Sequence, residues 1–187
     1  TAGSFTDVTQ DAWYYSYVTS ICQAGVMAGV SETSFGPAEP MTRAMVVTVL
    51  YRLSQDTSTY QTTFTDVPAG TWYTNAVGWA QTYGLAAGYE NGMFCPNDKI
   101  TREQFAAFLY RFAVFEGRAQ AGGGSDLAVF NDVSQVSGWA YPALQWAVAQ
   151  KIISGTPNGY LHPLANTTRA EAATILAQYI SLFRVAE

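Results

Sequence analysis

The chain repeats one pattern of residues three times, so its fold must be built from three copies of one unit. Residues 5–52 superimpose on residues 64–111 without a gap at a shift of 59. A third copy begins at Phe130 and, after one inserted residue, follows the second at a shift of 67. We therefore place the units at residues 1–54, 64–116 and 130–184. The segments between them include Ala-Gly-Gly-Gly-Ser at residues 121–125, a composition typical of flexible linkers.

Each unit is predicted to form a helix, a loop and a second helix. The first helix begins near a Trp and ends at Gly25 or Gly84, which can take the left-handed conformation; Lys151 in the third copy predicts a different cap. The second helix carries apolar residues at i, i+3, i+4 and i+7. These stripes are Val46, Val49, Leu50 and Leu53; Phe105, Phe108, Leu109 and Phe112; and Ala172, Ile175, Leu176 and Tyr179.

These patterns predict an all-α fold. A unit of this size is too small to support a core of its own, so the three stripes should converge and bury a shared one. We predict a pseudo-threefold arrangement of three helix-loop-helix repeats with the second helices at its centre.

A Thr-Arg pair opens each second helix. Thr42, Thr101 and Thr168 are natural N-caps, and Gln104 and Glu171 complete capping boxes in the second and third copies. Met45 breaks the box in the first copy.

The arginines of these pairs need another explanation. Arg43, Arg102 and Arg169 stand at the positive end of a helix dipole, where a cation is disfavoured by about 0.3–1 kcal/mol. Two compatible partners could offset the charge. One is the aspartate of each Phe-x-Asp-Val segment (Asp7, Asp66 and Asp132), and the other is an acidic ligand group drawn to the Arg and to free helix N–H groups.

Aromatic and glycine residues recur beside these positions. Trp13, Trp72 and Trp139 precede the first helices, and Gly29, Gly88 and Gly155 open the loops. Aromatic faces beside small residues suit a sugar ring, although aromatics that begin an amphipathic helix also pack in cores. Phe35, Phe94 and Leu161, each two residues before a Pro, are predicted to plug the loops.

The ordered set of Phe-x-Asp-Val, an aromatic helix, Gly-x-x-x-Gly, Phe-x-Pro and Thr-Arg-x-Glu/Gln resembles the S-layer homology domain, here in three consecutive copies. The resemblance implies a three-pronged spindle with a central three-helix bundle and grooves between adjacent units. It also implies an extracellular role: holding a surface protein non-covalently to the bacterial cell wall through a secondary wall polysaccharide, commonly one with pyruvylated mannosamine.

Carried over residue by residue, the glycan-binding positions are Arg43, Arg102, Arg169, Asp7, Asp66, Asp132, Trp13, Trp72, Trp139, Gly29, Gly88 and Gly155. The third copy departs most from the pattern, with Lys151 in place of Gly and Leu161 in place of the loop Phe. We therefore expect at least one groove to be degenerate.

Charge and composition exclude several other functions. A net charge of -5 has the wrong sign for a nucleic-acid binder, and no apolar run is long enough to insert in a membrane. The first residues do not resemble a signal peptide, which predicts a mature piece or an excised domain. Cys22 and Cys95 are too few for a disulfide framework and lack the C-x-x-C spacing of a metal site, so we expect structural thiols, with one disulfide as the alternative. No motif indicates a cofactor.

A catalytic role finds little support. His162 is the single histidine, and the equivalent positions in the other copies hold Gly36 and Cys95. No H-E-x-x-H, Walker A or G-x-S-x-G pattern occurs, although a pair of carboxylates for glycoside hydrolysis stays open. We predict a binder rather than an enzyme, since three sites on one polymer gain avidity. A protein–protein module with lateral contacts in a surface layer is the alternative.

Overall fold

The computed structural model describes residues 5–119 and 124–184. Its six α-helices are α1 (Tyr15–Gln23), α2 (Arg43–Ser54), α3 (Thr74–Thr82), α4 (Arg102–Phe115), α5 (Tyr141–Ala149) and α6 (Arg169–Phe183). Two short 3-10 helices, η1 (Leu127–Val129) and η2 (Val133–Gln135), precede α5. The described residues form no extended strand, so the all-α prediction is confirmed.

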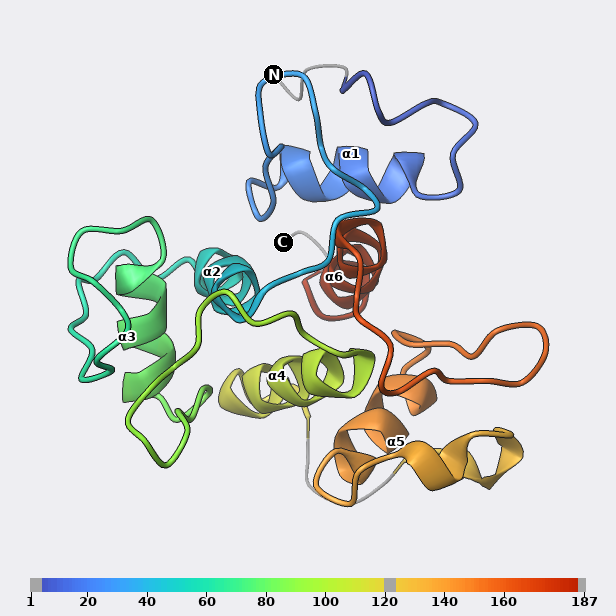
Figure 1. Ribbon diagram of the computed structural model, residues 1–187. Helices are drawn as coiled ribbons and strands as arrows, with labels where there is room; N and C mark the ends of the chain where they lie inside the picture. Colours follow the sequence, from blue (N-terminus) through green and yellow to red (C-terminus); the bar gives the residue numbers. More distant parts are fainter. Residues whose placement is uncertain (1–4, 120–123, 185–187) are drawn as a thin grey trace.

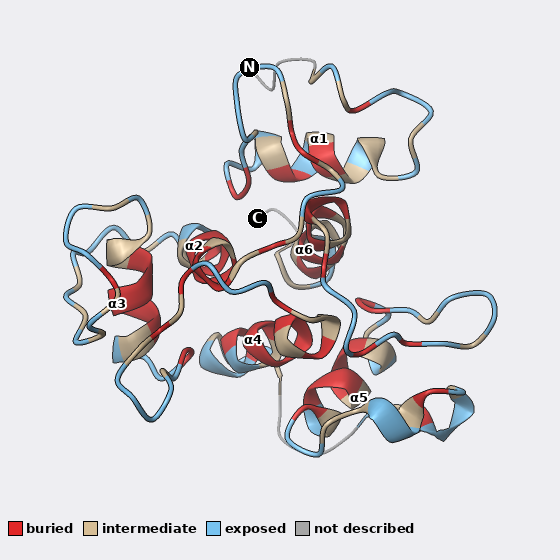
Figure 2. Cartoon of the chain, viewed as in Figure 1, coloured by how far each residue is buried: buried red, intermediate tan, exposed pale blue. Residues whose placement is uncertain are grey.

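The second helix of each repeat lies near the centre of the molecule and the first helix lies outside it (Figure 1). The predicted stripes on α2, α4 and α6 are buried, and Figure 2 shows buried residues on these central helices and also on α3 and α5. Each outer helix packs against the central helix of the preceding repeat: α3 against α2, α5 against α4, and α1 against α6. The repeats are therefore interlocked.

A closed ring of three backbone hydrogen bonds joins the segments that enter the central helices. The N–H of Met41 donates to the carbonyl of Thr167, at 2.8 Å. The N–H of Thr167 donates to Ile100, and that of Ile100 donates to Met41, each at 2.9 Å. All three residues are fully buried, so every repeat is tied to both others at the core.

The ring contains one polar side chain without a partner. Met41 and Ile100 are apolar, but the Oγ1 of Thr167 is buried and has no hydrogen-bond partner among the described residues. An unpaired buried hydroxyl costs about 1–3 kcal/mol.

Replacing Thr167 by Val should therefore raise the free energy of unfolding by about 1 kcal/mol, which corresponds to about 2–4 °C in melting temperature for a chain of this size. Thermal unfolding followed by circular dichroism measures the change. The matched control is Thr168→Val, which should destabilise the protein, because the Thr168 hydroxyl accepts the N–H of Glu171 at the start of α6. Equal destabilisation by both changes would contradict this account of Thr167.

All three outer helices are followed by a residue in the left-handed backbone conformation. Gly25, Gly84 and Lys151 have φ values of 71°, 67° and 58°, so Lys151 itself adopts the left-handed conformation. The prediction of a different cap in the third repeat was wrong. A side chain is tolerated there at some cost in strain.

The connecting segments are more ordered than their composition indicates. Residues 121–123 lie outside the described residues. Beyond them, the N–H of Ser125 donates to the carbonyl of Gln145 at 3.1 Å, and Leu127 is fully buried. In the first connection, the N–H of Tyr60 donates to the side chain of Asn75 in α3. Both connections are packed against an outer helix.

Candidate functional site

The three Phe-x-Asp-Val aspartates hold the loop of their own repeat. Asp7 accepts hydrogen bonds from the N–H groups of Phe35 and Gly36, both at 2.8 Å. Asp66 accepts from Phe94 and Cys95, and Asp132 from Leu161 and His162, at 2.7–2.9 Å. Phe35, Phe94 and Leu161 are fully buried, which confirms their predicted role as loop plugs.

These contacts also set the ionisation of two of the carboxylates. Burial alone would raise the pKa of Asp132, but the N–H groups of Leu161 and His162 lower it below its ordinary value. The pKa of Asp7 is lowered in the same way, against the effect of burial, by the hydroxyl of Ser34 and the N–H groups of Phe35 and Gly36. Both carboxylates are therefore charged at neutral pH.

The residue after each plug has a left-handed backbone conformation, and in the third repeat this residue is the single histidine. Gly36, Cys95 and His162 all have positive φ values, of 68°, 57° and 51°. Each donates its N–H to the aspartate of its repeat, so the aspartate fixes a left-handed turn there. His162 is exposed and stacks on Tyr160 with ring centroids 5.6 Å apart. Its place in the loop has a structural reason.

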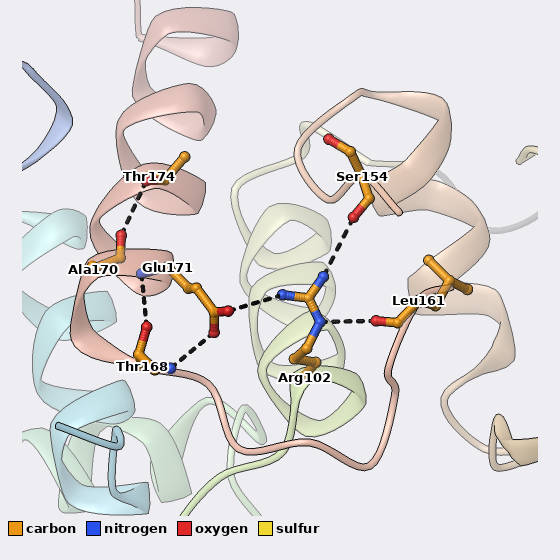
Figure 3. Close-up of polar contacts among 7 residues, drawn as sticks. All are labelled: Arg102, Ser154, Leu161, Thr168, Ala170, Glu171 and Thr174. Atoms are coloured by element: carbon orange, nitrogen blue, oxygen red, sulfur yellow. Dashed lines mark hydrogen bonds and ion pairs between the residues drawn. The ribbon is translucent and has the colours of Figure 1, made fainter. Parts of the chain in front are cut away.

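The three arginines bind carbonyl groups of the next repeat. Arg43 donates from Nε to Phe94, at 2.8 Å, and from Nη2 to Ala87, at 3.0 Å. Arg102 donates in the same way to Leu161 and Ser154, at 2.9 and 3.4 Å (Figure 3). Arg169 donates to Phe35 and Ala28 of the first repeat, at 2.8 and 2.5 Å. Each guanidinium thus binds one carbonyl near the start and one near the end of the loop in the next repeat.

The surroundings of these arginines differ from the predicted ones in two ways. Among the described residues, no ion pair joins Arg43, Arg102 or Arg169 to Asp7, Asp66 or Asp132. The helix N–H groups are not free either. The N–H groups of Arg43 and Ala44 donate to the carbonyls of Asp98 and Pro96, both at 2.9 Å. The other central helices repeat these bonds, so an anion would have to reach the guanidinium itself.

The three tryptophans are exposed. Trp13 and Trp72 are each 62% accessible and Trp139 is 57% accessible, so the alternative that they pack in the core is wrong. Trp13 and Trp72 meet the rings of Tyr14 and Tyr73 edge to face. An exposed indole held against a second ring presents a flat face for a ligand.

Two grooves combine an arginine with one of these tryptophans. The groove that we call the Arg169 groove encloses about 440 Å³ and is lined by Arg169, residues 27–30 of the first loop, one side of α2, and Trp72. The Arg102 groove encloses about 320 Å³ and is lined by Arg102, residues 152–156 of the third loop, one side of α6, and Trp13. Each groove contains residues from all three repeats.

The loop glycines have a packing role beside any role in the grooves. A Cβ on Gly29 would lie 2.6 Å from the ring of Phe5, and one on Gly88 or Gly155 would overlap the ring of Phe64 or Phe130. Gly29 and Gly155 also line the two grooves. The missing side chain therefore makes room for the Phe of Phe-x-Asp-Val.

Sequence reasoning missed several residues of this region. Arg52 lines the Arg169 groove from α2, and Gln178 holds the equivalent place on α6. Buried Glu103 accepts the N–H and hydroxyl of Ser137, at 2.9 and 2.7 Å, across two repeats. Arg52 and Arg111 are the last pair of residues in the alignment of residues 5–52 with 64–111. The alignment does not show which side of the helix faces the groove.

The thiols of Cys22 and Cys95 are not bonded to each other. Burial raises the pKa of both groups, so the thiols stay protonated at neutral pH. Within residues 5–119 and 124–184 no cluster of His, Cys, Asp and Glu is suited to hold a metal ion. None of the described helices combines the length and apolarity that crossing a bilayer requires.

The fold and the grooves define a closed module of three interlocked helical repeats. The chain belongs to the S-layer homology domain family, which matches residues 4–44, 63–106 and 129–173. The family match recovers all three repeats. Family membership places the chain at the bacterial cell surface, as part of the machinery that anchors surface proteins to the cell wall.

Individual relatives support this assignment. An endoglucanase of Bacillus sp. (strain KSM-635) is 31% identical over 175 residues, which are 92% of this chain and 18% of that protein. The surface-layer 125 kDa protein of Lysinibacillus sphaericus is 31% identical over 166 residues, 87% of this chain and 14% of that protein. A cellulosome-anchoring protein of Acetivibrio thermocellus is 32% identical over 94 residues, 50% of this chain and 20% of that protein. The chain spans no more than a fifth of each.

Proposed function

We propose that this module anchors a surface protein by binding an anionic, pyruvylated secondary wall polysaccharide in its inter-repeat grooves. The observation that carries the proposal is the pairing, in each of two grooves, of an arginine with an exposed tryptophan from another repeat. A guanidinium binds a carboxylate, and an indole face packs on a sugar ring. Nothing in the geometry requires catalysis for this role.

The repetition of the site is consistent with a polymeric ligand. Grooves that lie between the same three repeats are held at fixed separations, so one glycan chain can occupy more than one of them. Binding at a second groove is then intramolecular and strengthens attachment without further contacts. The aspartates and loop glycines contribute by shaping the loops that line the grooves.

The proposal predicts that the module binds purified cell wall, and that chemical removal of the secondary polysaccharide abolishes the binding. Co-sedimentation with wall before and after extraction measures this. Peptidoglycan from which the polysaccharide has been removed is the control surface, and the extracted polysaccharide should compete in solution. Binding that survives extraction would contradict the proposal and favour a protein or peptidoglycan partner.

A further inference from the structure

The three arginines are equivalent in sequence but lie in different electrostatic surroundings. The third residue of the central helix lies next to the arginine of the preceding repeat in α6, where Glu171 pairs with Arg102, and it lines the same groove as that arginine in α2. This residue is Met45 in α2, Gln104 in α4 and Glu171 in α6. The residue at this position is therefore apolar in the groove of Arg169, acidic beside Arg102, and neutral and polar in α4.

The charge of Arg102 is balanced by a carboxylate. Oε1 of Glu171 lies 3.8 Å from Nη1 of Arg102 (Figure 3). The other oxygen, Oε2, accepts the N–H of Thr168 at 2.9 Å as part of the capping box, so the carboxylate is fixed in place. Two turns further along α6, Gln178 adds no charge. A second carboxylate entering this groove would meet an arginine that is already paired.

The Arg169 groove has the opposite character. It is lined by two cations, Arg169 and Arg52, and its lining contains no acidic residue. Nη1 of Arg169 donates to none of the described residues, although Nε and Nη2 are bonded. Burial lowers the pKa of this guanidinium, and the charges of Glu39 and Asp7, both outside the groove, oppose that effect without forming an ion pair. A buried arginine without a paired carboxylate favours an incoming anion.

Aromatic rings cover the third arginine. Its guanidinium carbon lies 5.1 Å from the ring centre of Tyr89, 4.8 Å from Phe94 and 5.7 Å from Phe108. The residues equivalent to Tyr89 are Val30 and Thr156, and those equivalent to Phe108 are Val49 and Ile175. The rings of Tyr89 and Phe108 thus occupy space at Arg43 that smaller side chains leave open in the other two grooves.

We infer that the acidic group of the ligand binds in the Arg169 groove, between Nη1 of Arg169 and Arg52, and that Met45 selects this groove by placing no carboxylate in it. The Arg102 groove then suits a neutral sugar of the same polymer. This inference rests on the proposed function and adds to it which groove binds the anion.

Substitutions at Met45 test the inference. Met45→Glu places a carboxylate beside Arg169, as Glu171 lies beside Arg102, and should weaken binding to the extracted acidic polysaccharide at least about tenfold. Met45→Gln can form the same capping box without a charge, so it isolates the effect of the carboxylate, and its affinity should stay well above that of Met45→Glu. Because both variants complete the cap, neither should lower the melting temperature. Isothermal titration calorimetry at low and moderate salt measures the affinities.

A second pair of variants tests whether binding depends on the Arg169 groove and not on the equivalent position in the next repeat. Arg52→Gln should weaken binding several-fold, whereas Arg111→Gln, the matched change on α4, should not. The two arginines make similar long contacts to carbonyls, at 3.4 Å to Val26 and 3.5 Å to Leu85, so the loss of structure is comparable.

The outcomes distinguish the two proposals. Wild-type protein that fails to bind the polysaccharide would overturn the proposed function and this inference with it. Wild-type binding that Met45→Glu leaves unchanged, or that Arg111→Gln weakens as much as Arg52→Gln, would overturn the inference alone.

Discussion

Replacing Asp132 by Ala is expected to lower the free energy of unfolding by about 3 kcal/mol. The carboxylate is 3% exposed and accepts the N–H groups of Leu161 and His162, at 2.9 and 2.7 Å. Alanine leaves both donors without a partner, and each such loss costs about 1–3 kcal/mol. It also removes the contact that holds His162 at a φ of 51°. Urea denaturation measures the change in the free energy of unfolding when both proteins are fitted with the same dependence (m-value) on urea concentration.

The control is Asp126→Ala. Asp126 is exposed and accepts one N–H, that of Ala128, at 2.8 Å, so its loss should cost about 1 kcal/mol or less. Similar values for the two variants would contradict the assigned role of Asp132.

Acid should reproduce the same loss in the unmodified protein. The pKa of Asp132 is lower in the folded state than its ordinary value of about 3.9, so its stabilising effect is fully present above that value. As the pH falls below about 4 toward the folded-state pKa, the carboxylate is protonated and the effect is lost. The Asp132→Ala variant should therefore lose less stability than the wild type between pH 5 and pH 2.

Replacing Arg43 by Ala is expected to have a similar effect, a loss of about 3 kcal/mol. The side chain is 8% exposed, and its Nε and Nη2 donate to the carbonyls of Phe94 and Ala87 in the next repeat. The change leaves those carbonyls unpaired and removes a cation held over aromatic rings. Helical circular dichroism at 25 °C should persist while the melting temperature falls.

Arg118→Ala is the matched control for this prediction. Arg118 is an exposed arginine whose Nε lies 3.8 Å from Glu116, and an ion pair of an arginine this exposed to water is worth little. Its loss should change the free energy of unfolding by less than about 0.5 kcal/mol. A melting temperature for Arg43→Ala equal to that of Arg118→Ala would show that the hydrogen bonds of Arg43 to the next repeat do not contribute to stability.

Local patterns predicted the parts of the fold that depend on one repeat. The capping boxes at Thr101 and Thr168 form as expected, and the apolar stripes are buried. These features depend on residues three or four positions apart, where periodicity is informative. The left-handed glycines at the ends of the outer helices are equally local, whereas each plug is held by an aspartate 28 or 29 residues earlier in its own repeat.

The contacts of the arginines could not be predicted in this way. Alignment of the repeats shows that Arg43, Arg102 and Arg169 are equivalent, but their partners lie in the next repeat, 44 to 141 residues away. Only the packing of each outer helix against the preceding repeat brings those loops within reach. The same packing exposes the tryptophans, because the core is filled by the stripes and plugs instead.

The ring of Met41, Ile100 and Thr167 fixes how many copies the module can hold. An open array of repeats can grow or shrink by one copy, because its end repeats have a free face. Here the last copy bonds back to the first, so a fourth copy would find no unpaired backbone and two copies would leave the ring broken. During synthesis the ring closes only after the third copy emerges. Until then an incomplete chain has unpaired backbone groups at this position, so we expect misfolding to occur by exchange of repeats between chains.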